Sequence, residues 1–173
     1  MMMRLMGEFQ TTAGKILSME AAQRTIAAWR ARGERIVMAN GCFDPLHVGH
    51  ARYLDGAREL GDRLVVAVND DAGTAALKGP GRPVMPAADR ARLLAALRAV
   101  DAVVVFSGTN VNHLLETLRP DIHAKGTDYT PQSVPERALA EQLGIRIAIT
   151  GDPKQHASTD LLERLRRRPE GME

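Results

Sequence analysis

Five short apolar runs recur along the chain, and helical patterns separate them. The runs are rich in β-branched residues and too short for ordinary helices, so each predicts a strand. Continuous apolar runs of this kind are typical of parallel strands buried on both faces. They lie at residues 35–39, 63–68, 102–106, 122–124 and 145–149. With no internal repeat and no linker, this alternation predicts a single α/β domain, a Rossmann-like, doubly wound, five-stranded parallel sheet.

Length and composition narrow the functional classes. A chain of 173 residues suits one domain with a proper core. A net charge of +2 is too small to indicate a nucleic-acid or membrane partner, and 3% aromatic residues argue against a single-strand binder that stacks bases. One cysteine excludes an internal disulfide framework and fits a reducing cytoplasm. We therefore expect a cytoplasmic protein with no nucleic-acid partner and no membrane partner.

The ends of the domain follow from periodicity. Residues 1–17 show no sustained period and are expected to be poorly ordered, whereas residues 18–168 should form the domain and residues 169–173 a tail. Ser18 is a candidate N-cap for a first helix that Gly33 would end.

Further helices are expected at three places. An apolar stripe predicts a helix over residues 87–99. Ser133 and Glu136 have the spacing of a capping box for a helix that ends at Gly144. A last helix is expected to begin near Ser158.

One turn carries two histidines where a strand is expected to pass into a helix. His47 and His50 lie in the segment Asn-Gly-Cys-Phe-Asp-Pro-Leu-His-Val-Gly-His at residues 40–50. Ligands of open α/β sheets bind at the carboxyl ends of strands, and a helix N-terminus attracts anions. Solvated histidines and a zinc site are the alternatives, but Asp44 is the only further metal ligand nearby, so we predict no protein-bound metal.

The other predicted strands also end in loops rich in Lys, Arg, His and Gly. Parallel strands place these loops on one rim of the sheet, where we expect the functional chemistry. The loops are residues 42–50, 69–83, 107–110, 125–131 and 151–158. The chain has neither the G-x-x-x-x-G-K-[ST] phosphate loop nor the G-x-G-x-x-G fingerprint, which argues against a P-loop kinase and a dinucleotide oxidoreductase.

The segment at residues 40–50 resembles the G-[TC]-F-D-x-x-H-x-G-H signature of the nucleotidyltransferase superfamily. Three further blocks, at residues 60–71, 77–83 and 125–129, resemble one branch of it. That branch is the D-glycero-β-D-manno-heptose 1-phosphate adenylyltransferase domain of bifunctional ADP-heptose synthases. The resemblance runs from about residue 14 to residue 167.

The resemblance implies transfer of AMP from ATP to a sugar 1-phosphate, with Mg²⁺ on the triphosphate and pyrophosphate as the second product. The kinase half of such proteins has no counterpart in the sequence, so a separate sugar kinase is expected to supply the acceptor. Relatives often form homodimers. A cytidylyltransferase that makes CDP-glycerol or a related product is an alternative. A nucleotide-binding regulatory domain is the alternative without catalysis.

The resemblance also implies roles for individual residues. His47 and His50 would donate to triphosphate oxygens when protonated, and Lys78 and Lys125 would complete the catalytic group. The nucleotide would contact Cys42, Phe43, His47, Gly49, His50, Asp128, Ser158 and Thr159. The sugar phosphate would contact Asp44, Lys78 and Arg82.

Simpler interpretations exist for several of these residues. Lys78 and Arg82 are alternatively solvated loop charges, and Lys125 an ion pair with Asp128. Ser158 and Thr159 also suit a plain N-cap. Asp160 departs from the hydroxyl residue common in relatives.

Overall fold

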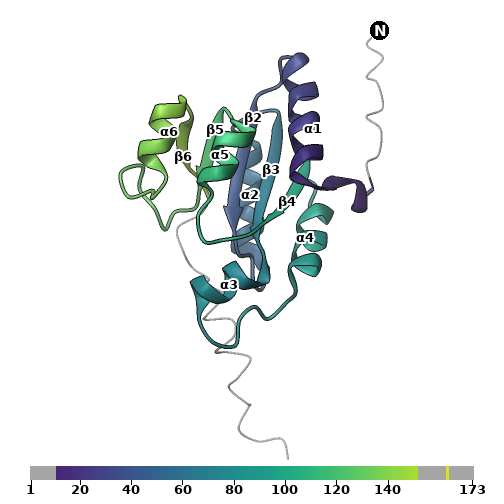
Figure 1. The fold of residues 1–173 in the computed structure, drawn as a ribbon, viewed down its shortest axis with the longest axis vertical. Coiled ribbons are helices and arrows are strands. Elements are labelled where there is room, and N and C mark those ends of the chain that lie inside the picture. Colours follow the sequence, from purple (N-terminus) through teal and green to yellow (C-terminus); the bar gives the residue numbers. More distant parts are fainter. Residues whose placement is uncertain (1–10, 152–162, 164–173) are drawn as a thin grey trace, which may run out of the picture.

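A six-stranded, fully parallel sheet forms the centre of the protein (Figure 1). The computed structural model describes residues 11–151 and Glu163. The strands are β1 (Ile16–Leu17), β2 (Ile36–Gly41), β3 (Arg63–Asn69), β4 (Ala102–Phe106), β5 (Ile122–Lys125) and β6 (Arg146–Ile149). Their spatial order is β1-β4-β3-β2-β5-β6. The predicted α/β class and doubly wound parallel sheet are confirmed, but residues 11–151 form six strands and not five.

The extra strand, β1, lies inside the segment expected to be poorly ordered. Residues Ala13–Lys15 form a 3₁₀ turn, and Ile16 and Leu17 then pair in parallel with Val103 and Val104 of β4. The Lys15 ammonium donates a hydrogen bond to the Val100 carbonyl at 2.7 Å. A two-residue strand is too short to show a period, which is why the sequence did not reveal it.

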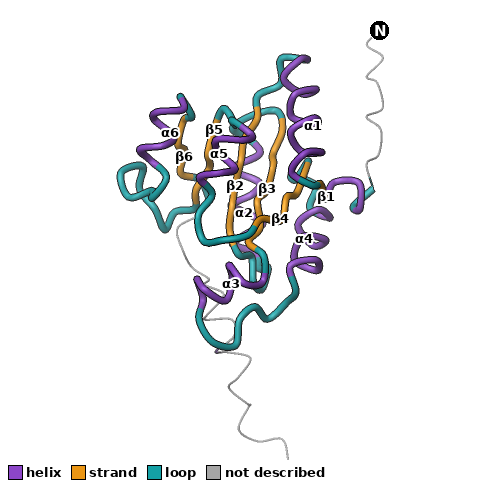
Figure 2. Tube along the Cα trace, viewed as in Figure 1, coloured by secondary structure: helices purple, strands orange, loops and turns teal. Residues whose placement is uncertain are grey.

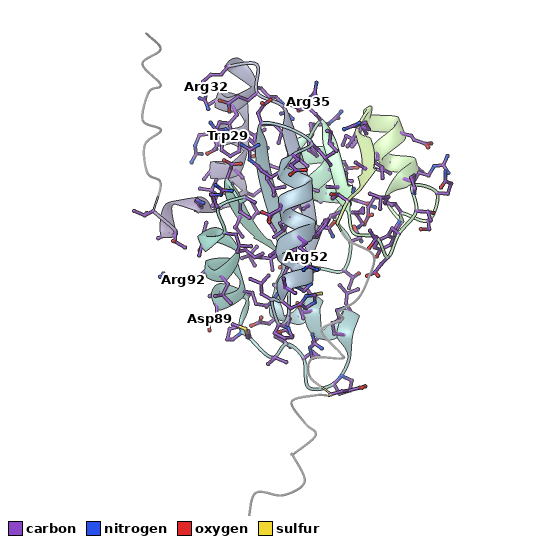
Figure 3. All side chains as sticks on the ribbon, turned by 180° about the vertical axis from the view of Figure 1, so that it is seen from behind. Trp29, Arg32, Arg35, Arg52, Asp89 and Arg92 are labelled. Carbon is purple, nitrogen blue, oxygen red and sulfur yellow. The ribbon has the colours of Figure 1, made fainter. Side chains whose placement is uncertain are left out.

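Helices cover both faces of the sheet. The helices are α1 (Met19–Ala31), α2 (Val48–Arg58), α3 (Asp71–Lys78), α4 (Ala87–Ala96), α5 (Asn112–Leu118) and α6 (Arg137–Leu143). Helices α1, α5 and α6 pack on one face, in front of the sheet in Figure 1. Helices α2 and α4 pack on the other face, which is turned toward the viewer in Figure 3.

Each face has its own apolar core. On the first face, Ile26 and Trp29 of α1 and Leu115 of α5 pack against strand residues such as Val65 and Val104. On the second face, the buried residues Leu54 of α2 and Leu94 of α4 pack against Val66 and Val103. Burial of one large aliphatic side chain stabilises the fold by roughly 1.5–3 kcal/mol. The strands are therefore apolar on both faces, as their sequences predicted.

The structure differs from the sequence prediction at three helices. Helix α3 lies in the segment expected to be a loop, and the Asp70 carboxylate caps it by accepting from the Gly73 N–H. Helix α4 ends at Ala96 and not at Ala99. The predicted capping box before α6 is wrong, because Ser133 bonds within its own turn to Thr130 and Glu136 makes no cap bond.

Strand order reverses at β2, and this reversal places the candidate site. From β2 the chain runs outward through β3 to β4, then returns to the other side of β2 as β5 and β6 (Figure 2). The carboxyl ends of β2 and β5 therefore flank a topological switch point, where ligands of open α/β sheets bind. Asn40 and Lys125 stand at those two ends.

Candidate functional site

The turn between β2 and α2 is fixed by packing. Cys42, Phe43 and Asp44 are buried, and Phe43 has a φ of 50°, a left-handed conformation that L side chains rarely adopt. The Phe43 ring lies edge-on to His50, with centroids 5.1 Å apart. A Cβ at Gly41 would come within 3.2 Å of the Phe43 ring, so glycine permits this close approach. The turn thus presents a defined backbone at the start of α2.

His47 and His50 stack on each other at the first turn of α2, with ring centroids 3.8 Å apart. His47 is the N-cap: its Nδ1 accepts the Gly49 N–H at 3.1 Å. In return, Nδ1 of His50 accepts the His47 N–H at 3.3 Å. This is a capping box in which imidazoles replace the usual hydroxyl and carboxylate. The structure brings both predicted residues together at a helix N-terminus.

The capping bonds decide which nitrogen of each ring carries the proton. A ring whose Nδ1 accepts a hydrogen bond carries its proton on Nε2. Burial, with the nearby charges of His47 and Lys78, lowers the pKa of His50 to about 3. His50 is therefore neutral at neutral pH, contrary to the expectation of a protonated donor. It still donates, through Nε2–H.

Lys78 ends α3 and is exposed. Its charge contributes to the lowered pKa of His50, so the lysine lies close enough to act on the same site electrostatically. Lys78 therefore projects from the end of a helix, whereas the sequence predicted that it lies in a loop. Residues 79–83, the remainder of the loop predicted at residues 69–83, contain no helix or strand.

Asp44 and Arg82 join that loop to the histidine turn. Nε of Arg82 lies 2.8 Å from the Asp44 carboxylate, and Nη2 donates to the Asp44 carbonyl. The same carboxylate accepts the N–H groups of Val84 and Met85 at 2.8 and 2.9 Å. Burial opposes ionisation of Asp44, but the hydrogen bonds from Val84, Arg82 and Met85 outweigh it and lower the pKa. Arg82 is therefore an anchored cation and not a solvated loop charge.

Lys125 ends β5 and is buried in a polar cluster. Its ammonium donates to the Asn40 Oδ1 at 3.2 Å and to the Glu136 carboxylate at 3.3 Å, and it lies 4.8 Å from the Tyr129 ring centroid. The simpler interpretation of Lys125 was an ion pair with Asp128, and the structure shows an ion pair with Glu136. Burial lowers the pKa of Lys125, and the Glu136 charge opposes that shift.

The remaining predicted nucleotide contacts differ in position. Asp128 is exposed in the loop after β5. Ser158 and Thr159 lie outside the described residues. Cys42 is buried, with its thiol 3.7 Å from the Asn69 Oδ1, as a small packed residue would be.

Arg90 is a residue that sequence reasoning missed. It is fully buried in α4, and its guanidinium donates to the carbonyls of Cys42, Asn69 and Met85 and to the Asp71 carboxylate. One side chain thereby ties the histidine turn, the end of β3, the start of α3 and the Arg82 loop together. The available signal was an arginine on the apolar stripe of a predicted helix. Arginine is rarely buried unless it is paired, so this position indicated a buried residue with polar partners.

The described residues contain no group of three or more His, Cys, Asp and Glu side chains placed to hold a metal ion. Among these same residues, no helix combines the length and apolar character that crossing a membrane requires.

Comparison with known proteins gives one family. Residues 38–161 match the cytidylyltransferase-like family, and this range contains every predicted site residue. The bifunctional protein HldE of Magnetococcus marinus is 46% identical over 151 residues, which cover 87% of this chain and 31% of that protein. The chain thus spans about a third of the length of the curated relatives that it matches.

Two solved structures share the fold. The lipopolysaccharide core biosynthesis protein from Thermoplasma volcanium superposes with a TM-score of 0.60 at 27% identity, covering 70% of this chain and all of that one. The pantoate-β-alanine ligase from Francisella tularensis, at 14% identity and a TM-score of 0.61 over 83% of this chain and 68% of its own, shares the fold. With the paired histidines at the start of α2 and the match over most of its length, the chain belongs to the cytidylyltransferase-like family of nucleotidyltransferases.

Proposed function

We propose that the protein transfers AMP from ATP to a sugar 1-phosphate, D-glycero-β-D-manno-heptose 1-phosphate, and releases pyrophosphate to give ADP-heptose. The observation that carries this proposal is the arrangement of His47 and His50 at the N-terminus of α2, each with its proton on Nε2. Two fixed N–H donors at a helix N-terminus suit the oxygens of a triphosphate. The similarity to HldE proteins favours the adenylyl group and the heptose acceptor.

The reaction needs positioning and charge stabilisation. An oxygen of the sugar phosphate forms a bond to the α-phosphorus of ATP, while the bond between that phosphorus and the α–β bridging oxygen breaks and pyrophosphate leaves. No covalent intermediate with the protein is required, so alignment and stabilisation of negative charge supply the catalysis. In the proposal, His47 and His50 donate to the triphosphate, and Lys78 and Lys125 neutralise charge on the transferring and leaving groups.

Nucleotide and acceptor have separate contacts in this proposal. Cys42, Phe43 and Gly49 line the nucleotide through their backbone, and Asp128 binds the ribose. Ser158 and Thr159 reach the triphosphate from outside the described part of the chain. Arg82, with Lys78, binds the sugar phosphate. Asp44, whose carboxylate oxygens are occupied, contributes by orienting Arg82.

Mg²⁺ fits this site as a partner of the nucleotide. The described residues offer no cluster of three metal-ligating side chains, and the Asp44 carboxylate is engaged by Arg82 and the loop backbone. Mg²⁺ commonly keeps several waters and binds through substrate phosphates. We therefore propose that the triphosphate oxygens hold the ion, which neutralises phosphate charge, and that His47, His50 and the lysines act on the oxygens that remain.

A substrate matrix tests the proposal. Pyrophosphate release is measured for ATP, CTP, GTP and UTP, each with heptose 1-phosphate, other sugar 1-phosphates and glycerol 3-phosphate. We expect release with ATP and heptose 1-phosphate, and formation of ADP-heptose by mass spectrometry. His50→Ala, purified in the same way, controls for contaminating enzymes, and His113→Ala, on the exposed side of α5, is the matched histidine variant outside the site.

Each contrary result has a distinct meaning. Preference for CTP would contradict the adenylyl assignment and leave the reaction class intact. Turnover with ATP and a different phosphate would contradict only the acceptor. If wild-type protein binds nucleotide but releases no pyrophosphate with any pair, the chain is a nucleotide-binding domain and not an enzyme.

A further inference from the structure

Glu136 forms a buried ion pair that the proposed reaction has not used. The residue directly precedes α6, where its side chain makes no capping bond. Its carboxylate instead lies 3.3 Å from the Lys125 ammonium, and the two residues are only 6% and 5% exposed. The Glu136 side chain thus does not cap α6, and its carboxylate pairs with the buried Lys125 ammonium instead.

The position of the pair connects it to the site. Lys125 ends β5, and Asn40, at the end of the neighbouring strand β2, accepts from the same ammonium at 3.2 Å. The contact between Asn40 and Lys125 thus crosses the gap between the two strands at which the sheet order reverses. Asn40 is also joined directly to the histidine turn through Gly41. Glu136 holds Lys125 from the start of α6.

Several of the described residues surround the ion pair, among them Tyr53 of α2, whose phenol donates to the Ala124 carbonyl and whose pKa is raised by burial and by the charge of Glu136. Asn40 is neutral, and His123 of β5, which shares the Asn40 Oδ1 through Nε2 at 3.0 Å, has a pKa of about 3 because of burial and is also neutral. From the loop before α6, Tyr129 contributes its ring face, and its phenol pKa is raised by burial and by the charges of Glu136 and Asp128. Glu136 is thus a carboxylate in direct contact with the ammonium, at 3.3 Å.

A buried lysine without such a partner tends to lose its proton. Burial disfavours the charged form, whereas an opposite charge within about 4–6 Å favours it. A buried ion pair is also weak evidence for a purely stabilising role, since well-packed apolar residues often serve stability as well or better. The arrangement is better explained by a requirement for a charged ammonium at this place.

We propose that Glu136 is a positioning residue that keeps the Lys125 ammonium charged and aimed at substrate phosphate across the β2–β5 switch point. An ammonium has three N–H bonds, and of the described side chains Asn40 and Glu136 accept from two of them, so the third is assigned to a phosphate oxygen. The inference rests on the proposed function, because it takes a phosphate as the partner of that third donor.

The first test measures the lysine itself. The protein is labelled with ¹³C at the lysine ε-carbon, and the Lys125 signal is identified by its loss in Lys125→Arg. In Glu136→Gln we expect the pKa of Lys125 to fall by about one unit or more, the usual scale for removal of a close opposite charge. In Glu136→Asp, which keeps the charge, we expect the pKa of Lys125 to remain near that of the wild type.

The second test measures turnover against pH. In Glu136→Gln we expect kcat on the alkaline limb of its pH profile to fall about tenfold for each unit by which the Lys125 pKa falls, because the charged fraction above the pKa changes tenfold per unit. The alkaline limb of the kcat profile should also move to lower pH, while Glu136→Asp should recover much of the rate. Glu141→Gln is the matched control, because Glu141 lies on α6 in an exposed pair with Arg137.

Thermal unfolding of each variant separates the two roles. If Glu136→Gln lowers the melting temperature but leaves both the Lys125 titration and the kcat profile unchanged, the pair only joins β5 to α6 and the inference is wrong. Should Glu136→Gln fail to fold, the Lys125 titration and the kcat profile are compared in Glu136→Asp. A Lys125 pKa that moves while the kcat profile stays unchanged would equally overturn the inference. Absence of turnover in the wild type would instead contradict the proposed function.

Discussion

Asp44 and Arg82 lie 38 residues apart in the sequence and form an ion pair with 2.8 Å between Nε and the carboxylate. The pair joins the histidine turn to the loop that follows Lys78. The carboxylate also accepts two backbone N–H groups of that loop. If the loop moved away, the buried charge of Asp44 would lose its partners.

Replacement of Asp44 by Asn should therefore affect both stability and activity. An amide carries no charge to pair with Arg82 and accepts through only one atom. We expect a loss of about 3–5 kcal/mol in the free energy of unfolding, the scale for breaking a buried pair. Urea denaturation measures it. The Michaelis constant for the sugar phosphate should rise, because Arg82 loses its orientation. Asp55→Asn, at an exposed position of α2, is the control and should change neither quantity.

Arg90→Lys should weaken the contacts that hold the histidine turn, the end of β3, the start of α3 and the Arg82 loop together. A lysine has one nitrogen and cannot reach the four acceptors that the guanidinium now satisfies. We expect a loss of at least about 3 kcal/mol of stability, because buried carbonyls are left without donors. Chemical denaturation followed by circular dichroism checks it.

The neighbouring Arg92 provides the comparison for this substitution. It lies two residues along α4 and is exposed, as Figure 3 shows from behind. Arg92→Lys should leave stability within about 0.5 kcal/mol of the wild type, as surface substitutions usually do. Equal losses in the two variants would contradict the role given to Arg90.

The sequence was sufficient to predict the class of fold because each strand is a continuous apolar run. Such runs are typical of strands buried on both faces, and most residues of β2 to β4 are buried. The two-residue β1 has too few residues to carry such a signal. Helix α3 was missed because its small, polar and charged residues in residues 70–74 resemble a turn.

The candidate site was predictable where its residues are neighbours in the sequence. His47 and His50 are three residues apart, so one helix turn brings them together whatever the rest of the chain does. The pairs Asp44–Arg82 and Lys125–Glu136 depend on how separate elements dock. Glu136 shows the difference clearly: local spacing predicted a capping box, whereas the tertiary structure offered the carboxylate a buried ammonium.

Stability should fall as the pH is lowered from about 7 to about 5. His50 and His123 each have a pKa of about 3 in the folded protein, chiefly because of burial. Unfolded histidine titrates near 6.5, so below that pH the unfolded state binds protons that the folded state does not. Each group then removes up to about 1.4 kcal/mol per pH unit, and above about pH 7 it has no effect.

Urea denaturation at several pH values tests this window, which lies above the range in which carboxylates titrate. His123→Gln keeps an amide donor for Asn40 but does not titrate, so its stability should depend less steeply on pH. His113→Gln, on the exposed side of α5, should keep the wild-type slope. A slope in His123→Gln equal to that of the wild type would show that burial does not hold this histidine neutral.

Substitution of His47 by Asn and by Ala should separate capping from chemistry. Asn is among the best N-cap residues, so His47→Asn retains an acceptor for the Gly49 N–H, whereas His47→Ala removes it. We expect Ala to lose about 1 kcal/mol of stability and Asn to lose little. Both variants lack the Nε2–H donor, so turnover should fall at least about a hundredfold in each, and also in His50→Ala. Thermal unfolding and steady-state pyrophosphate release measure the two effects. Near wild-type turnover in His47→Asn would mean that the ring serves only as a cap, and the triphosphate donor would then have to be sought elsewhere on the rim.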